Sequence, residues 1–229
     1  MPMPKWPTTP WSKILRLHED DPVKAQDALS QILMVYYQPI RQYMACHASA
    51  QDAEDWANDF AARMMEKNLP GRAQVGHHFR NYLSASLRNY VMDQYRKGKR
   101  DPLAKAADPE VLERIGNAER VFNREWGTLL IQRALDRLGK EPRGANEPSV
   151  SPEELLMLRL KYGLVEDGRS RSYKDICKEL GKELENHTID NALRRTKKAL
   201  LGRLREEVEQ LTATENQVDE ELWEISKFL

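Results

Sequence analysis

The side chains best suited to chemistry lie in one strongly basic segment, residues 191–205. It carries six basic side chains and no acidic one, and these are Arg194, Arg195, Lys197, Lys198, Arg203 and Arg205. Lys and Arg neutralise the phosphates of nucleic acids, which supplies much of the affinity of DNA-binding proteins. The segment therefore predicts a phosphate-binding helix face. On these residues alone, a solvated basic face on an ordinary pair of helices is an equally good interpretation.

Two helices and a turn would position this segment. Ser172 followed by Asp175 is a capping box, which predicts that a helix begins at the next residue after Ser172. Gly181 can end that helix in the left-handed conformation, and a polar connection over 182–187 leads to the basic helix. A short helix packed behind a basic amphipathic helix is the helix-turn-helix pattern, whose second helix enters the major groove of DNA.

A second basic stretch, residues 80–100, is interleaved with aromatic side chains. It holds six basic residues and one acidic residue. Phe79 comes just before this stretch, and Tyr82, Tyr90 and Tyr95 lie within it. Aromatic rings stack on unpaired bases at about 1–3 kcal/mol each, so the mixture suits single-stranded nucleic acid. The alternative is that most of these rings are core residues and that the basic end is a solvated tail.

Two acidic segments accompany the basic ones. The helix expected over about 52–67 opens with Asp52, Glu54, Asp55 and Asp59, with no basic residue between 51 and 60. Acids near a helix N-terminus are favoured by the helix dipole, so capping alone would explain them. Residues 206–229 hold eight acids and one base. This tail could fold back on the basic helix and mask it, or it could be an exposed solubilising segment.

The totals bound the classes of function. The chain has 229 residues, which suggests one or two domains, and its 36 basic residues balance 36 acidic ones. Nucleic-acid binding therefore has to come from local patches. No run is apolar enough for a membrane span and no signal-peptide core is present, which predicts a cytoplasmic protein. No catalytic constellation or nucleotide-binding glycine motif emerges, so we expect no enzyme activity and no cofactor.

The residues that most often bind metals give no site either. Cys46 and Cys177 lie far apart on apolar helix faces, so we interpret them as small core residues. The pair His77 and His78 lacks a further ligand at the spacing a metal site needs. We therefore expect no bound metal.

The expected fold is all-α, with two small helical domains joined by a linker, because no segment has the pattern of a strand. The expected parts are an N-terminal extension (1–21), a first domain (22–100), a linker (101–118), a second domain (119–208) and an acidic tail (209–229). Hydrophobic spacing and capping signals predict the main helices over about 22–46, 52–67, 78–97, 119–138 and 152–162, ahead of the helix-turn-helix.

With both halves in view, the chain resembles the extracytoplasmic-function group of sigma-70-type RNA polymerase sigma factors. The first domain is similar to sigma region 2. The family's Asp-Ala-Glu-Asp start matches residues 52–55, and its Gln-Asp/Glu-x-Phe motif follows, with Asn58 in place of Gln. Its downstream pattern is matched in spacing by Phe79, Tyr82, Leu83, Asn89, Asp93, Arg96 and Lys97. Ser86 stands where an apolar residue is usual.

The second domain is similar to sigma region 4. The matching segments are 173–176, 180–181 and 188–195, and the turn over 182–187 is about two residues longer than usual for the family. Helix-turn-helix motifs are common, so each motif alone has little specificity. Two different domains in the right order, covering roughly 22–100 and 119–208, are much more specific.

The resemblance implies three sets of contact residues. Those for the clamp helices in the largest subunit of the polymerase are Asp55, Asn58, Asp59 and Arg63. Those for reading and melting the minus-ten element are Arg72, His78, Phe79, Arg80, Tyr82, Arg88, Asn89, Asp93, Arg96 and Lys97. Those for the minus-thirty-five element are Thr188, Asn191, Arg194, Arg195, Lys197 and Lys198. Catalysis would belong to the polymerase.

The implied function is that of a sigma factor, which binds core RNA polymerase and directs promoter recognition and DNA melting. The implied partners are the core polymerase, through the clamp helices and the flap, promoter DNA and, as an option, an anti-sigma factor. Two alternatives stay open. One is a stand-alone helix-turn-helix transcription regulator, and the other is a helical interaction protein that acts on the transcription machinery.

Overall fold

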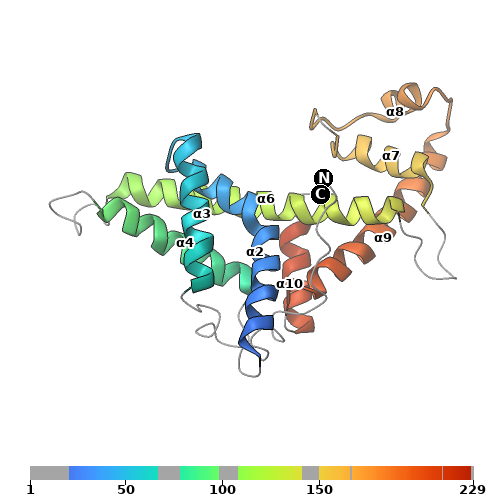
Figure 1. Cartoon of the computed structure of the whole chain (residues 1–229). Helices are drawn as coiled ribbons and strands as arrows, with labels where there is room; N and C mark the ends of the chain where they lie inside the picture. The colour runs from blue at the N-terminus through green and yellow to red at the C-terminus, as the bar shows by residue number, and fades with distance from the viewer. Residues whose placement is uncertain are drawn as a thin grey trace. The chain divides into compact units, whose positions relative to one another are not determined.

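The computed structural model of the chain describes residues 21–66, 78–97, 108–140, 150–165, 167–212 and 214–227. All regular structure in these ranges is α-helical, which confirms the expected fold class (Figure 1). The helices are α2 (Pro22–Ala45), α3 (Ala50–Glu66), α4 (Phe79–Arg96), α6 (Pro109–Lys140), α7 (Pro152–Lys161), α8 (Tyr173–Leu180), α9 (Asn186–Glu209) and α10 (Glu215–Ser226). Within the described ranges, no helix has the length and apolar character needed to cross a membrane.

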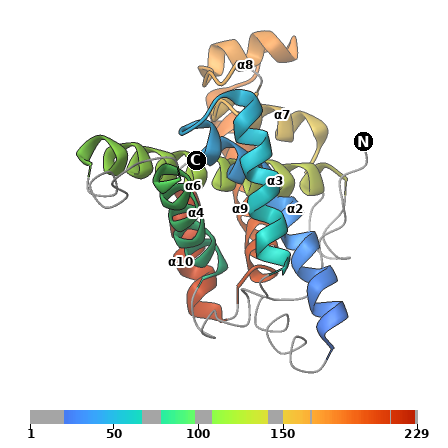
Figure 2. The same cartoon turned by 60° about the vertical axis from the view of Figure 1, so that its left-hand side comes forward.

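The helices fall into two compact units. The first combines the described part of Met1–Gly127 with Glu209–Glu220, and the second combines Thr128–Val208 with the described part of Glu221–Leu229. In the first unit α2 and α3 lie side by side, as both views of the chain show (Figures 1 and 2). In the second unit α8 follows α7 and packs against it.

Helix starts coincide with the predicted capping residues. The Asp21 carboxylate accepts the backbone N–H three residues on, at 3.2 Å, ahead of a proline at the first helical position. Ser151 with Glu154, and Ser172 with Asp175, form complete capping boxes in which each pair exchanges two hydrogen bonds. Capping satisfies backbone N–H groups that have no partner within the helix, so these local signals fix where α2, α7 and α8 begin.

Helix α6 differs from the expectation. A helix was expected from about residue 119, but α6 already begins at Pro109 and covers the described end of the expected linker. Asp108 caps it, because its side chain accepts the backbone N–H of Glu110 at 3.0 Å. Val111, Ile115 and Ala118 follow at helical spacing and are buried. The boundary between the two compact units falls at residues 127 and 128, inside this helix.

The core of the first unit is rich in large side chains. Its almost fully buried residues are Tyr36, Ile40, Tyr43, Met44, Met64, Leu83, Leu87, Phe122 and Trp126. Burial of each large apolar side chain stabilises a fold by roughly 1.5–3 kcal/mol. The Trp126 indole N–H donates to the Tyr36 hydroxyl at 3.1 Å, so this polar group keeps a partner inside the core. The pair ties α2 to α6 within the first unit.

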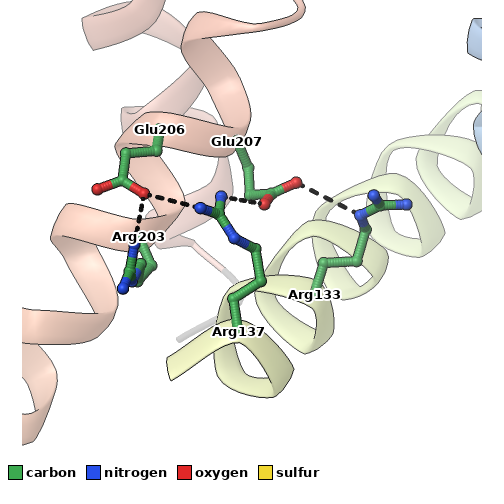
Figure 3. A network of polar contacts seen from close by, with 5 residues as sticks. All are labelled: Arg133, Arg137, Arg203, Glu206 and Glu207. Carbon is green, nitrogen blue, oxygen red and sulfur yellow. Dashed lines mark hydrogen bonds and ion pairs between the residues drawn. The ribbon is translucent and has the colours of Figure 1, made fainter. Parts of the chain in front are cut away.

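A buried polar network lies in the second unit, between α6 and the end of α9 (Figure 3). Its members are Arg133, Arg137, Arg203, Glu206 and Glu207. Glu207 is 1% exposed and accepts from Arg137 at 2.7 Å and from Arg133 at 3.4 Å. Glu206 accepts from Arg137 at 3.2 Å and from Arg203 at 3.0 Å. Charges removed from water in this way need partners, and the network supplies them.

This network changes the interpretation of two charged segments. Arg203 was counted among the six cations of the basic segment, but its side chain is 7% exposed and paired with Glu206. Glu206 and Glu207 were counted at the start of the acidic tail, but they belong to α9. Glu206 and Glu207 therefore hold α9 against α6, and the exposed Lys and Arg residues of α9 are Arg194, Arg195 and Lys198.

Candidate nucleic-acid interface

The helix-turn-helix predicted from the sequence is formed by α8, a short turn and α9. Gly181 ends α8 in the left-handed conformation, with φ 64° and ψ 27°. Its N–H donates to the carbonyl of Lys178 at 3.2 Å, and the N–H of Lys182 donates to the carbonyl of Cys177 at 3.1 Å. This pair of bonds is the Schellman motif, in which glycine avoids the strain that a Cβ would meet at positive φ.

The turn is shorter than expected. The expected connection ran over 182–187, but α9 begins at Asn186, so the turn covers 181–185. The backbone carbonyl of Glu185 accepts the first helical N–H groups. The thiol of Cys177 is directed at the carbonyl of Leu184, 3.6 Å away. The partly buried cysteine therefore packs against the backbone of the turn.

Each helix of the motif buries an isoleucine. Ile176 of α8 and Ile189 of α9 are both fully buried. Thr196, also fully buried, donates its hydroxyl to the carbonyl of Ala192 at 2.8 Å, which satisfies a polar group in the core. These residues form the inward face of α9, and the opposite face is left for solvent or a ligand.

A polar clamp joins the N-terminal ends of α8 and α9. The Tyr173 hydroxyl donates to the carboxylate of Asp190, and this hydrogen bond raises the pKa of the tyrosine above its ordinary value. The Lys161 ammonium lies 4.5 Å from the centre of the Tyr173 ring. Because α7, α8 and α9 all contribute to this cluster, the start of α9 has a fixed place in the unit.

Five of the six residues expected at the minus-thirty-five element are exposed on α9. These are Thr188, Asn191, Arg194, Arg195 and Lys198, whereas Lys197 is half-buried. Arg194 donates to the side-chain oxygen of Asn191 at 2.9 Å, one turn back along the helix. His187 is exposed as well and precedes Asn191, Arg194 and Lys198 at helical spacing. His187 was not among the residues expected to bind DNA, because residue 187 was expected in the turn and not on the helix.

The first unit exposes part of the second basic stretch. Five expected minus-ten residues are exposed along the C-terminal half of α4 and at the residue after it, and these are Arg88, Asn89, Asp93, Arg96 and Lys97. Arg96 pairs with Asp93 at 3.2 Å, and Arg88 lies 3.9 Å from Glu119. Both contacts are weak surface pairs that a phosphate can replace.

The first two residues of α4 pack against core side chains instead. Phe79 is 2% exposed and meets the ring of Tyr36 edge-on at 5.3 Å. Arg80 donates to Asn123 and lies 4.9 Å over the ring of Trp126. Phe79 is thus a core ring and is not positioned to stack on a base, which was the alternative left open for this stretch.

The three remaining residues of the minus-ten set differ from these in burial and contacts, or lie outside the described residues. Tyr82 is half-buried. His78 lies just before α4, and its Nε2 is 2.8 Å from the carboxylate of Glu220, a residue of the same compact unit. Arg72 lies outside the described residues.

The acidic helix α3 presents the residues expected to contact the polymerase. Asp55, Asn58 and Asp59 are exposed, and Arg63 is half-buried. Asp59 accepts from the Tyr90 hydroxyl at 2.7 Å and pairs with Arg63 at 2.8 Å. Burial opposes ionisation of Asp59, but these two donors outweigh it and lower the pKa of the carboxyl.

The four α3 residues therefore differ in what they do inside the unit. Asp59 and Arg63 join α3 to α4 through Tyr90, whose ring lies 5.1 Å below the Arg63 guanidinium. Asn58 accepts from the Tyr37 hydroxyl of α2 at 2.9 Å. Asp55 is exposed on the same helix. Asp55 is thus the position at which a test of partner binding disturbs the fold least.

Comparison with known proteins adds no family assignment. No protein-family model, curated protein or solved structure matches the chain. The functional argument therefore rests on the residues and on their placement. The first unit contains the acidic helix α3 and the basic C-terminal half of α4. The second unit contains the basic helix-turn-helix formed by α8 and α9.

Proposed function

We propose that the protein is a sigma factor of the extracytoplasmic-function group, which binds core RNA polymerase and directs promoter recognition and DNA melting. The observation that carries the proposal is the helix-turn-helix of the second unit. Its α9 directs Asn191, Arg194 and Lys198 away from the apolar face formed by Ile189 and Leu193. Asn and Arg are the side chains that most often read adenine and guanine in the major groove.

The first unit supplies the features that distinguish a sigma factor from a simple DNA-binding regulator. The exposed half of α4 would contact the minus-ten element through Arg88, Asn89, Arg96 and Lys97. The exposed acids of α3 would meet the clamp helices of the polymerase. The flap would be the second polymerase contact, made by the second unit. In this proposal the protein acts in the cytoplasm, and the polymerase performs all catalysis.

Transcription in vitro tests the proposal. Core RNA polymerase would be combined with the protein and with sheared genomic DNA of the source organism, and the 5′ ends of the transcripts would be mapped. The expected result is a set of start sites that needs the protein and that shares two sequence elements upstream. Unchanged initiation with and without the protein would contradict the sigma proposal.

A stand-alone regulator is the second candidate, and the helix-turn-helix by itself favours it. This candidate predicts sequence-specific duplex binding by the isolated protein, with no retention of core polymerase. The acidic face of α3 would then have no role in function. A helical interaction protein would show neither DNA binding nor polymerase-dependent initiation.

A further inference from the structure

The four cations in the middle of α9 do not share one environment. Arg194 and Lys198 are exposed on the face that also holds His187 and Asn191. Arg195 turns toward α7 and forms an ion pair with the carboxylate of Glu154. Lys197 is half-buried, and its ammonium lies 5.0 Å from the centre of the Tyr162 ring, just after α7. Helix α7 and the residue that follows it therefore contact two of the four cations.

Glu154 is itself held in place. Its side chain is 12% exposed, and its second oxygen accepts the backbone N–H of Ser151 at 3.0 Å in the capping box of α7. The positive end of the α7 dipole favours a carboxylate at this position. Glu154 therefore stays beside Arg195, and a phosphate that approached Arg195 would meet this negative charge.

We propose that Glu154 withholds Arg195 from the DNA backbone, so that the middle of α9 engages phosphates through Arg194 and Lys198 only. The inference rests on the proposed DNA-binding role of α9. It adds which cations of that helix contact phosphates and which one an ion pair holds back. Arg195 is then a positioning residue that docks α9 against the N-terminus of α7. The neighbouring acid Glu153 pairs with Lys182 of the turn, so the same helix end holds a second cation of the motif.

The salt dependence of DNA binding reports how many phosphates a surface neutralises. Each phosphate contact contributes about −0.9 to the slope of log K against log salt concentration. Loss of a cation that touches a phosphate therefore makes the slope shallower by about 0.9. Loss of a cation that only positions the helix leaves the slope unchanged, even where it lowers the stability of the fold.

The test uses the full chain and a random-sequence DNA duplex, because phosphate contacts do not depend on sequence. Fluorescence anisotropy would give the affinity over a range of NaCl concentrations. Arg194→Gln and Lys198→Gln should each make the slope shallower by about 0.9, whereas Arg195→Gln should leave it unchanged. Glu154→Gln should make the slope steeper by about 0.9, because it releases Arg195. Gln at this position still accepts the capping hydrogen bond.

Two controls isolate the pair. The double variant Glu154→Gln/Arg195→Gln should return to the slope of the unmodified protein. Glu183→Gln makes the same change in charge at an exposed position of the turn, and it should leave the slope unchanged. If Glu183→Gln steepens the slope as much as Glu154→Gln does, general electrostatics explains the effect and the inference fails.

The outcomes separate the inference from the function on which it rests. If Arg195→Gln makes the slope as shallow as Arg194→Gln does, Arg195 touches phosphate and the inference is wrong, while DNA binding by α9 stands. If the unmodified protein shows no salt-dependent duplex binding, the DNA-binding role of α9 is overturned and the inference falls with it. A double-mutant cycle in thermal unfolding measures the coupling of Glu154 to Arg195 without DNA, and zero coupling would also overturn the inference.

Discussion

The carboxylate of Glu207 lies 2.7 Å from the guanidinium of Arg137 in a position where Glu207 is 1% exposed. Arg133, 9% exposed, lies on the other carboxylate oxygen at 3.4 Å. Glu207 of α9 therefore forms ion pairs with two arginines of α6. Because α9 also carries the proposed DNA-binding residues, this contact determines where the helix sits in the second unit.

Removal of the Glu207 charge should strongly destabilise the second unit. Glu207→Gln removes the buried charge that pairs with Arg133 and Arg137, and breaking a buried ion pair costs about 3–5 kcal/mol. The comparison variant Glu206→Gln removes a carboxylate that is itself 32% exposed, so water compensates part of the loss and the cost should be smaller. Urea denaturation followed by circular dichroism measures both. Equal, small losses would show that the network contributes little to stability.

The stability of the first unit should depend on pH through His47. Burial, with a smaller contribution from Arg114, lowers the pKa of His47 from 6.5 to about 4. Its Nδ1 lies 3.0 Å from the Tyr95 hydroxyl. The unfolded chain takes up a proton near pH 6.5, but the folded protein does so only near pH 4. The histidine therefore lowers the free energy of unfolding as the pH falls through this interval, by up to about 1.4 kcal/mol per pH unit.

His47→Gln tests this dependence. The variant keeps a polar side chain but cannot take up a proton, so its stability should fall less steeply between pH 6.5 and pH 4. Denaturant titrations of both proteins at several pH values give the difference, which cancels the contributions of other groups. Parallel stability curves for the two proteins would exclude His47 as the source.

Two glycines at positive φ should respond differently to the same substitution. Gly163 has φ 65° and Gly181 has φ 64°, so alanine costs about 1–2 kcal/mol at either position from backbone strain. A Cβ at Gly163 would also lie 2.7 Å from the carbonyl oxygen of Gly168, whereas a Cβ at Gly181 would meet open space. Gly163→Ala should therefore lower the melting temperature more than Gly181→Ala. The reverse order would contradict the packing of the loop after α7.

Local signals in the sequence predicted much of this fold. The capping boxes at Ser151 and Ser172 and the glycine at 181 act within one helical turn, so they are legible without knowledge of the tertiary structure. Tyr36, Ile40 and Tyr43 follow one another at helical spacing, which predicts a shared helix face, and all three are buried. These signals fixed helix type and most helix starts.

The misses came from contacts between distant residues. Arg203 looked like part of a basic face, but its side chain is 7% exposed and pairs with Glu206 one turn along α9. The sequence left two roles open for Phe79, base stacking or a place in the core. Its ring packs against Tyr36, which is distant in the sequence, so that neighbour could not be read from local spacing. Asp108 and Pro109 cap and open α6, which runs without a break into the helix expected from about residue 119. The number of charges or aromatic rings in a segment does not predict which side of its helix packs against the rest of the protein.

Retention of core RNA polymerase by the tagged protein tests the central claim most directly. Asp55→Asn is the informative variant, because Asp59 is already bound to Tyr90 and Arg63 and its loss would disturb the fold. Glu66→Gln makes the same charge change at the exposed end of α3 and serves as the control. The account predicts that the unmodified protein and the control retain the polymerase, and that Asp55→Asn retains much less. A failure of the unmodified protein to retain core polymerase would contradict the sigma-factor proposal.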